Sequence, residues 1–335
     1  MLLLDIHAIK SLINTVGLKK FFLLLIEQLE TDFSHWETFS KTPRHATHYK
    51  HGVIELMPCS DEQRYSFKYV NGHPYNTRDG NLCVAAMGLL ADVKSGYPLM
   101  ISEMTILTAI RTAAVTALGA KYLARKNASK LSIIGSGSQA EFQAIAVQSL
   151  FSVGEVKIYD IDDNAMQKFC NNLSGEFKSI TKCSSISECV KNTDIIITAT
   201  AAKKSVELFG RDEIQPGTHI HAMGGDCPGK TELGADLLKS SKLVVEFSEQ
   251  SLIEGEIQQL DKNAIHAELW QIIKQAKPGR ENNSEITIFD SVGFALEDFS
   301  VLNLIYTLAL NNNTGQEIEL IPALKDPKDL YGFLK

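Results

Sequence analysis

The stretch Leu131-Ser132-Ile133-Ile134-Gly135-Ser136-Gly137-Ser138-Gln139-Ala140 decides the fold class of this chain. An apolar, strand-like run leads directly into G-x-G-x-x-A and then into a helix-periodic segment, which is the order used by dinucleotide-binding domains. Gly135 permits the tight turn, Gly137 lets the backbone approach a pyrophosphate, and Ala140 keeps strand and helix close together. Small-residue turns also occur in plain packing roles, so the motif needs support from its surroundings.

That support comes from Asp160, which ends the next strand-like segment, Val156–Tyr159, roughly 25 positions after Gly135. A carboxylate there accepts hydrogen bonds from the ribose hydroxyls of NAD and repels the 2′-phosphate of NADP. The residues that follow, Ile161 to Asn164, include no arginine. We therefore expect NAD as the cofactor. The alternative is that Asp160 only caps the next helix.

The chain around the motif alternates between helix-like and strand-like segments. Helices are expected at 105–125, from about 139, at 163–174 and at 295–311, and strands at 131–134, 156–159, up to 183, and at 195–198, 219–223, 243–247 and 286–289. Strands separated by helices predict a parallel, doubly wound sheet. The fold class is therefore α/β, with a Rossmann-type domain.

Residues 1–112 follow a different pattern. Asp5 is placed to cap a helix that Gly17 interrupts and that resumes to about Phe33. Strand-like runs follow at 51–58, 64–70 and 82–100, the last divided by the turn-forming Lys94-Ser95-Gly96. This order predicts an α+β domain. We expect residues 1–112, joined by a returning 306–335, to form one domain and residues 113–305 the NAD-binding domain.

Composition narrows the class of protein. The chain has 335 residues, 44% hydrophobic and 22% charged, with a formal net charge of -7, an ordinary globular balance that disfavours a nucleic-acid binder. Its six cysteines form no metal-binding spacing and are expected to be reduced thiols. We expect no signal peptide, no metal and no membrane span, and a soluble cytoplasmic protein.

Four charged residues in the first part of the chain are candidates for binding a substrate. Glu55 and Lys68 each interrupt an apolar strand-like run, and Arg44 and Arg111 carry guanidinium forks suited to a carboxylate. Period-2 alternation also allows Glu55 and Lys68 to point into solvent. Single arginines are commonly surface charges. The sequence pattern leaves both interpretations open.

The segment Met223-Gly224-Gly225-Asp226-Cys227-Pro228-Gly229-Lys230-Thr231-Glu232-Leu233 is the strongest functional candidate outside the glycine motif. It follows a predicted strand, at the carboxyl edge where ligands of doubly wound folds bind. Its glycines and Pro228-Gly229 predict a tight loop that presents Asp226 and Lys230.

Several stretches together resemble the ornithine cyclodeaminase/μ-crystallin family, and in particular its bacterial cyclodeaminases. They are 52–58, 67–74, 111–113, 224–233, 253–259, 289–295 and 326–332, so the resemblance covers nearly the whole chain. The family implies conversion of L-ornithine to L-proline and ammonia by internal hydride transfer through tightly held NAD, in a homodimer whose first domain binds the substrate and the partner subunit.

The resemblance also implies the site residues. Arg44, Lys68 and Arg111 would bind the substrate carboxylate, Glu55 would handle the amine, Asp226 would act as acid and base, and Cys227 would face the substrate. The cofactor residues would be Cys83, Arg111, Gly135, Gly137, Ser138, Gln139, Asp160, Thr200, Met223, Gly224, Gly225, Asp226, Lys230 and Ser291. Cys83 departs from the threonine of the bacterial enzymes, and a thiol is a weaker hydrogen-bond partner.

Three alternatives to this activity remain open on the sequence. An amino-acid dehydrogenase or cyclic imine (ketimine) reductase would use the same scaffold and consume the cofactor stoichiometrically. A lysine cyclodeaminase would accept a substrate that differs from ornithine by one methylene, worth only about 1–3 kcal/mol of discrimination. A crystallin-like binding protein would hold nucleotide and ligand without turnover, but retention of both Glu55 and Asp226 argues against it.

Overall fold

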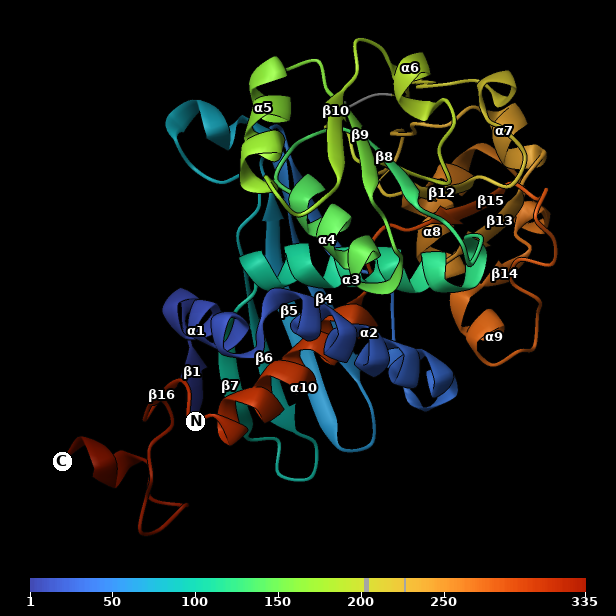
Figure 1. Cartoon of the computed structure of the whole chain (residues 1–335). Helices are drawn as coiled ribbons and strands as arrows, with labels where there is room; N and C mark the ends of the chain where they lie inside the picture. The colour runs from blue at the N-terminus through green and yellow to red at the C-terminus, as the bar shows by residue number, and fades with distance from the viewer. Residues whose placement is uncertain (202–204, 226) are drawn as a thin grey trace.

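The computed structural model describes residues 1–201, 205–225 and 227–335, and it contains two eight-stranded sheets (Figure 1). One sheet is built mainly from the first 103 residues and the other from residues 130–290.

The second sheet has the predicted parallel arrangement. Its strands lie in the order β10-β9-β8-β11-β12-β15-β13-β14, and every pairing between neighbours is parallel. Their bounds are β8 Lys130–Ile134, β9 Glu155–Tyr159, β10 Ser179–Lys182, β11 Ile195–Thr198, β12 His219–Ala222, β13 Lys242–Val245, β14 Ala267–Glu268 and β15 Thr287–Asp290. The chain order reverses between β8 and β11, which is where doubly wound folds bind their ligands. The prediction of a Rossmann-type α/β fold is confirmed.

The first sheet is mostly antiparallel. Its main path is β16-β1-β7-β6-β5-β4-β2, and β3 also pairs with β4. The bounds are β1 Leu2–Leu4, β2 Ser40–Lys41, β3 His45–Tyr49, β4 Gly52–Ser60, β5 Arg64–Gly72, β6 Ala86–Asp92, β7 Pro98–Glu103 and β16 Gln316–Glu317. The three predicted strand regions correspond to β4, β5 and the β6–β7 hairpin. The sequence pattern did not reveal β1, a three-residue strand parallel to β7.

The principal helices fall where periodicity predicts them. They are α1 Ile6–Val16, α2 Leu18–Ser34, α3 Thr105–Leu123, α4 Ala140–Leu150, α5 Asp163–Asn172 and α10 Ala295–Asn311. Shorter helices are α6 Ile186–Val190, α7 Ala235–Lys239, α8 Ser248–Glu254 and α9 Leu269–Ile273. Asp5 caps α1 as expected, accepting a hydrogen bond from the Ala8 N–H. Gly17, at φ +84°, separates α1 from α2.

Helix α3 joins the two sheets and positions the site between them. It packs against β6 of the first sheet and against β12 and β15 of the second, and Figure 1 shows it crossing the middle of the molecule. Helices α2 and α10 lie below it in that view, with α10 packed on β4, β5 and β6. The chain therefore returns to the first sheet after β15, and residues 291–298 connect the carboxyl edge of the second sheet to the first.

Candidate active site

The glycine-rich loop lies at the carboxyl end of β8, as the motif predicts. Gly135 has φ +100°, and a Cβ there would lie 2.4 Å from the carbonyl oxygen of Ala199, so only glycine fits. A Cβ at Gly137 would meet nothing within 4 Å, which leaves open space in front of the backbone. Helix α4 begins at Ala140, so its positive end faces that space.

Polar atoms beside this loop fit a phosphate-bearing dinucleotide. The buried Oγ of Ser136 and Oε1 of Gln139 have no hydrogen-bond partner among the described residues. Lys168 on α5 adds a cation, donating to the Gly137 carbonyl at 2.9 Å and pairing with Glu141. Nothing in the sequence around Lys168 marked it as a candidate. The loop thus combines open backbone, unsatisfied polar atoms and a nearby positive charge.

Asp160 lies at the end of β9, beside the glycine-rich loop. Its Oδ2 accepts a hydrogen bond from the Ser136 N–H at 2.6 Å and its Oδ1 one from the Asp162 N–H. The N-cap of α5 is Asp162, not Asp160, so the capping alternative for Asp160 is wrong.

Lys68 and Arg111 meet around one carboxylate in the interior. Lys68 Nζ lies 2.8 Å from Asp298 Oδ2, and Arg111 Nε lies 3.1 Å from Asp298 Oδ1, while Arg111 also pairs with Glu297. The Lys68 side chain is only 1% exposed, so the solvent-facing interpretation of this residue is wrong. Burial and the positive charge of Arg111 lower the pKa of Lys68 to about 8. Both cations retain donors that no described residue accepts.

Arg44 lies between two buried carboxylates. Its Nη1 lies 3.2 Å from Glu55 Oε2 and its Nε lies 3.2 Å from Glu254 Oε2. Its Nη2 donates to the carbonyls of Val292 and Gly293. Glu55 is buried as well, so the solvent-facing alternative fails for it too. Lys68 is affected by the charges of both arginines, which places the three predicted cations in one cluster.

The turn at residues 291–293 joins this cluster to the second sheet. Glu246, just after β13, accepts hydrogen bonds from the N–H groups of Val292 and Gly293 at 3.0 and 2.9 Å. Gly293 has φ +80°, and a Cβ there would lie 2.7 Å from Arg111 Nη1. Burial and the neighbouring Glu297 raise the pKa of Glu246 well above its ordinary value. The charged cluster therefore lies at the carboxyl edge of the parallel sheet.

The loop that follows β12 is held against the same edge. Lys230 donates to the carbonyl of Thr200, and the Gln258 side-chain amide donates to the carbonyls of Cys227 and Lys230 and accepts from the Gly229 N–H. The motif at 253–259 thus packs directly on the motif at 224–233. Asp226, predicted as the acid and base, lies outside the described residues.

The remaining predicted residues lie in three places. Met223, Gly224 and Gly225 follow β12, and Ser291 follows β15 with its Oγ 3.0 Å from Nε2 of His221, whose pKa burial lowers to about 3. Cys83 lies in the loop between β5 and β6, where its Sγ donates to the Pro74 carbonyl at 3.6 Å.

Sequence patterns did not single out the acids that organise these cations. Glu246, Glu254, Glu297 and Asp298 are all buried. A signal existed for the last two, because the pair Glu297-Asp298 interrupts an otherwise apolar stretch. Glu246 and Glu254 follow no pattern that distinguishes them from solvent-facing acids.

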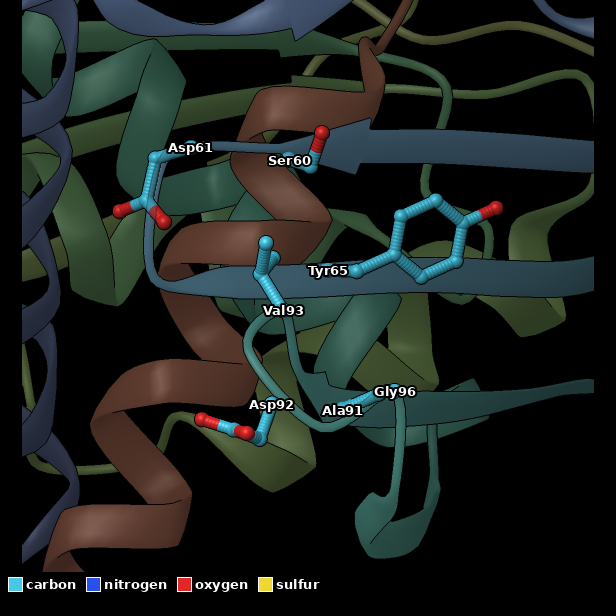
Figure 2. Close-up of a pocket in the computed structure, with 7 residues that line it drawn as sticks. All are labelled: Ser60, Asp61, Tyr65, Ala91, Asp92, Val93 and Gly96. Atoms are coloured by element: carbon cyan, nitrogen blue, oxygen red, sulfur yellow. The ribbon is translucent and has the colours of Figure 1, made fainter.

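A separate hollow lies at the turn ends of β4 to β7. It has a volume of about 310 Å³ and is lined by residues such as Asp61, Tyr65 and Asp92 (Figure 2). Asp61 accepts from the backbone of Gln63 and Arg64, and Asp92 from Ser95, so each acid serves its own turn. This hollow lies on the first sheet and is lined by none of the candidate residues.

Among the described residues, no three or more histidine, cysteine or acidic side chains are arranged to hold a metal ion. The described helices also include none that is both long and apolar enough to traverse a bilayer.

Known proteins that are similar to this chain include one family and several individual relatives. The family model "Ornithine cyclodeaminase/mu-crystallin family" matches residues 7–313. An ornithine cyclodeaminase of Brucella suis is 48% identical over 98% of this chain and 91% of its own length. A Thermococcus litoralis Δ1-pyrroline-2-carboxylate reductase, solved with NADH and L-proline, is 34% identical with a TM-score of 0.88, covering 95% and 100% of the two chains. An archaeal alanine dehydrogenase dimer with bound NAD is 33% identical with a TM-score of 0.88, covering 96% and 99%.

Proposed function

The chain belongs to the ornithine cyclodeaminase/mu-crystallin family, and we propose that it is an NAD-dependent enzyme that converts L-ornithine to L-proline and ammonia. The observation that carries this proposal is the 48% identity to the Brucella suis cyclodeaminase along 98% of the chain. The buried cations and the dinucleotide loop lie at the same carboxyl edge of the parallel sheet, which supports it, because an amino-acid carboxylate and NAD would then meet at that edge.

NAD would be held by groups on several loops. The backbone at Gly135 to Gln139 and the end of α4 would bind the pyrophosphate, and Asp160 the ribose hydroxyls. Thr200, Met223, Gly224, Gly225, Lys230 and Ser291 would surround the remainder, with Cys83 approaching from the first sheet. When bound, NAD would accept a hydride from the substrate α-carbon and return it after ring closure.

The cations would bind and orient the substrate carboxylate. Lys68 and Arg111 have donors left after pairing with Asp298, whereas the donors of Arg44 are directed to Glu55, Glu254 and backbone carbonyls. An α-amino acid brings both a carboxylate and an ammonium. Its binding could therefore replace the Arg44–Glu55 ion pair by two new ones: Arg44 would bind the substrate carboxylate and Glu55 would bind the amine.

The proton steps would belong to Asp226 and Glu55. The side-chain ammonium of ornithine must lose a proton before its nitrogen can attack the α-carbon. We assign that step to Asp226 on the family resemblance, with Cys227 beside it. Holding the amine and the α-carbon together inside the pocket would favour ring closure over hydrolysis.

We further propose a homodimer formed through the open face of the first sheet. Helix α10 covers one face, and the other carries a row of paired apolar side chains: Pro58, Phe67 and Leu89, and beside them Leu56, Tyr69 and Met87. Leu56 and Met87 are 47% and 48% exposed. A contiguous apolar patch of this kind marks an interaction site. The archaeal relative is described as a dimer.

We also propose a cytoplasmic location and a division into a substrate-binding and dimerisation part and an NAD-binding part, close to the boundaries expected from the sequence (1–112 with 306–335, and 113–305). The return to the first part is at the start of α10, Ala295, rather than at residue 306, because α10 packs on β4, β5 and β6. No disulfide joins cysteines within the described residues, and Cys59 and Cys189 are buried thiols, as suits a reducing compartment.

A second candidate is an amino-acid dehydrogenase or imine reductase, favoured by the likeness to the alanine dehydrogenase and the pyrroline-2-carboxylate reductase. The experiment that separates the candidates is product analysis with ornithine, lysine and alanine at NAD far below substrate concentration. The proposal expects proline and ammonia from ornithine, many per NAD. A rise of NADH equal to the substrate consumed would instead identify a dehydrogenase, and pipecolate formed faster from lysine would identify a lysine cyclodeaminase.

A further inference from the structure

Three fully buried acids form a chain of hydrogen bonds along the carboxyl edge of the second sheet. The first is Asp290, the last residue of β15. Its Oδ1 accepts from the Glu256 N–H at 2.9 Å and its Oδ2 from the Ile257 N–H at 2.9 Å. One carboxylate therefore holds two successive backbone groups of the segment that follows α8.

Glu256, whose N–H is held by Asp290, in turn accepts hydrogen bonds from two successive backbone N–H groups. Its Oε1 accepts from the Glu232 N–H at 2.7 Å and its Oε2 from the Leu233 N–H at 2.9 Å. Glu232 then accepts from the Thr200 N–H at 2.9 Å and from the Thr200 hydroxyl. Each acid thus holds the backbone that carries the next group, and we call Asp290, Glu256 and Glu232 the carboxylate ladder.

Glycines of two sequence motifs make room for the ladder. A Cβ at Gly224 would lie 1.9–2.1 Å from the carboxylate atoms of Glu232, and one at Gly225 would lie 2.9 Å from Glu256 Oε1. A Cβ at Gly255 would lie 2.6 Å from Asp290 Oδ2. None of these three glycines has a positive φ, so close approach of a ladder acid is the reason for glycine at each position.

Burying these acids is energetically costly. No lysine or arginine of the described residues forms an ion pair with Asp290 or Glu256. Burial raises the pKa of Asp290 to about 7, and burial together with the charge of Asp290 raises that of Glu256 to about 8. A fold that needed only filled space here would use apolar side chains. The acids instead fix backbone groups whose positions matter.

We propose that Asp290, Glu256 and Glu232 are positioning residues that fix Thr200, residues 224–225 and residues 232–233 in the geometry needed for cofactor binding and catalysis. The inference rests on the proposed function, which puts NAD and the substrate amine at these two segments. The ladder links the ends of β11, β12 and β15 through the 255–257 segment. A displacement of any one of the three acids would therefore also displace the groups around the cofactor.

The test compares three isosteric amide variants. In Glu256→Gln and Asp290→Asn, an amide NH2 must face a backbone N–H, because both carboxylate oxygens are acceptors. In Glu232→Gln the Oε1 contact to Thr200 can remain, since Oε2 has no hydrogen-bond partner among the described residues. Relief of charge burial alone predicts that all three variants become more stable. The proposed role of the ladder predicts that the variants at positions 256 and 290 lose stability and that the stability of the variant at 232 changes little.

The readouts are backbone hydrogen exchange of the protein without cofactor and NAD affinity by calorimetry. In Glu256→Gln, exchange at Glu232 and Leu233 should accelerate at least tenfold and NAD affinity should fall about tenfold. Asp290→Asn should do the same, with faster exchange first at Glu256 and Ile257. Unchanged exchange and unchanged NAD affinity in both variants would overturn the ladder.

Asp194→Asn is the matched control. Asp194 also accepts from two successive backbone N–H groups, Ser129 and Lys130, and in addition pairs with Arg125, but it lies at the amino edge of the same sheet. Its variant should lose stability and keep NAD affinity; an equal loss of NAD affinity would mean that the ladder effect is only general destabilisation. If the unmodified protein makes no proline from ornithine, the proposed function fails, while the exchange comparison still decides the ladder.

Discussion

Lys68 and Asp298 lie 230 positions apart in the chain, yet Nζ and Oδ2 form a 2.8 Å ion pair in the interior. The same carboxylate contacts Arg111, so one acid on α10 pairs with two cations, one on β5 and one on α3. The pair fastens the returning helix to the first sheet and leaves donors of both cations available to a substrate carboxylate.

The first prediction concerns this shared carboxylate. Asp298→Asn should lower the free energy of unfolding by about 3–5 kcal/mol, because it leaves the buried Lys68 without a carboxylate partner and Arg111 with Glu297 alone. Chemical denaturation measures the change. The control is Glu176→Gln, which breaks the exposed pair with Lys19 and should cost less than about 1 kcal/mol. Equal small losses in both variants would mean that Asp298 is not the partner of the cluster.

The second prediction is a pH dependence of carboxylate binding. The pKa of Lys68 is lowered to about 8, so in the free enzyme its ammonium loses its proton as the pH rises through about 8. The affinity for L-proline, measured by calorimetry, should then fall by up to about tenfold per pH unit above that point. Lys68→Arg, which stays charged, should remove this decline. A flat profile in the unmodified enzyme would exclude Lys68 from the carboxylate site.

The same shift affects stability with the opposite sign. The folded pKa of Lys68 lies below its ordinary 10.5, so the folded state releases the proton first. This group therefore contributes a rise in folding stability as the pH increases from about 8 to about 10.5.

The third prediction is cofactor choice. Asp160 would face the 2′-phosphate of NADP, so NAD should bind more tightly than NADP. Asp160→Asn should bring the two affinities at least tenfold closer, since a neutral amide no longer repels the phosphate. Asp162→Asn, which only alters the cap of α5, should leave the ratio unchanged. Equal binding of NAD and NADP by the unmodified enzyme would contradict the assignment.

The fourth prediction is that Asp226→Asn lowers proline formation by on the order of 10²–10⁴, the usual contribution of a general acid or base. NAD binding should persist, because its main proposed contacts are the glycine-rich loop and Asp160. Ammonia release and NAD calorimetry on the same sample separate the two effects. Near-normal turnover would transfer the proton step to another group, such as Glu55.

The fifth prediction concerns the dimer. The double variant Leu56→Glu/Met87→Glu places charges on the open apolar face and should convert the dimer to a monomer in sedimentation or light scattering. Leu310→Glu changes an exposed leucine on α10 and should leave the dimer intact. A monomeric unmodified protein would refute the interface at once.

The sequence predicted the parallel sheet and its ligand edge because these depend on local signals. The G-x-G-x-x-A turn, the acid after the next strand and the helix and strand periods all lie within short windows. Asp160 and Gly135 are accordingly adjacent in the structure, with the Gly135 N–H bonded to the Tyr159 carbonyl.

The counter-ions of the site could not be predicted in the same way. Whether Lys68 faces solvent or the interior depends on which face of the first sheet α10 covers, and Asp298 reaches it only through a long-range return of the chain. The ladder is a similar case, because its hydrogen bonds connect loops that are 23 to 34 positions apart. The glycines at 224, 225 and 255 carried a signal of close packing, but not the identity of the acids that approach them.

The most direct test of the central claim, internal hydride transfer during cyclisation, uses L-ornithine deuterated at the α-carbon with unlabelled NAD far below substrate concentration. Mass spectrometry of the product should find L-proline that retains the deuterium at its α-carbon, because the hydrogen removed from each substrate molecule returns to it. Proline that has lost the deuterium, or deuterium that accumulates in reduced cofactor in step with substrate loss, would contradict the account.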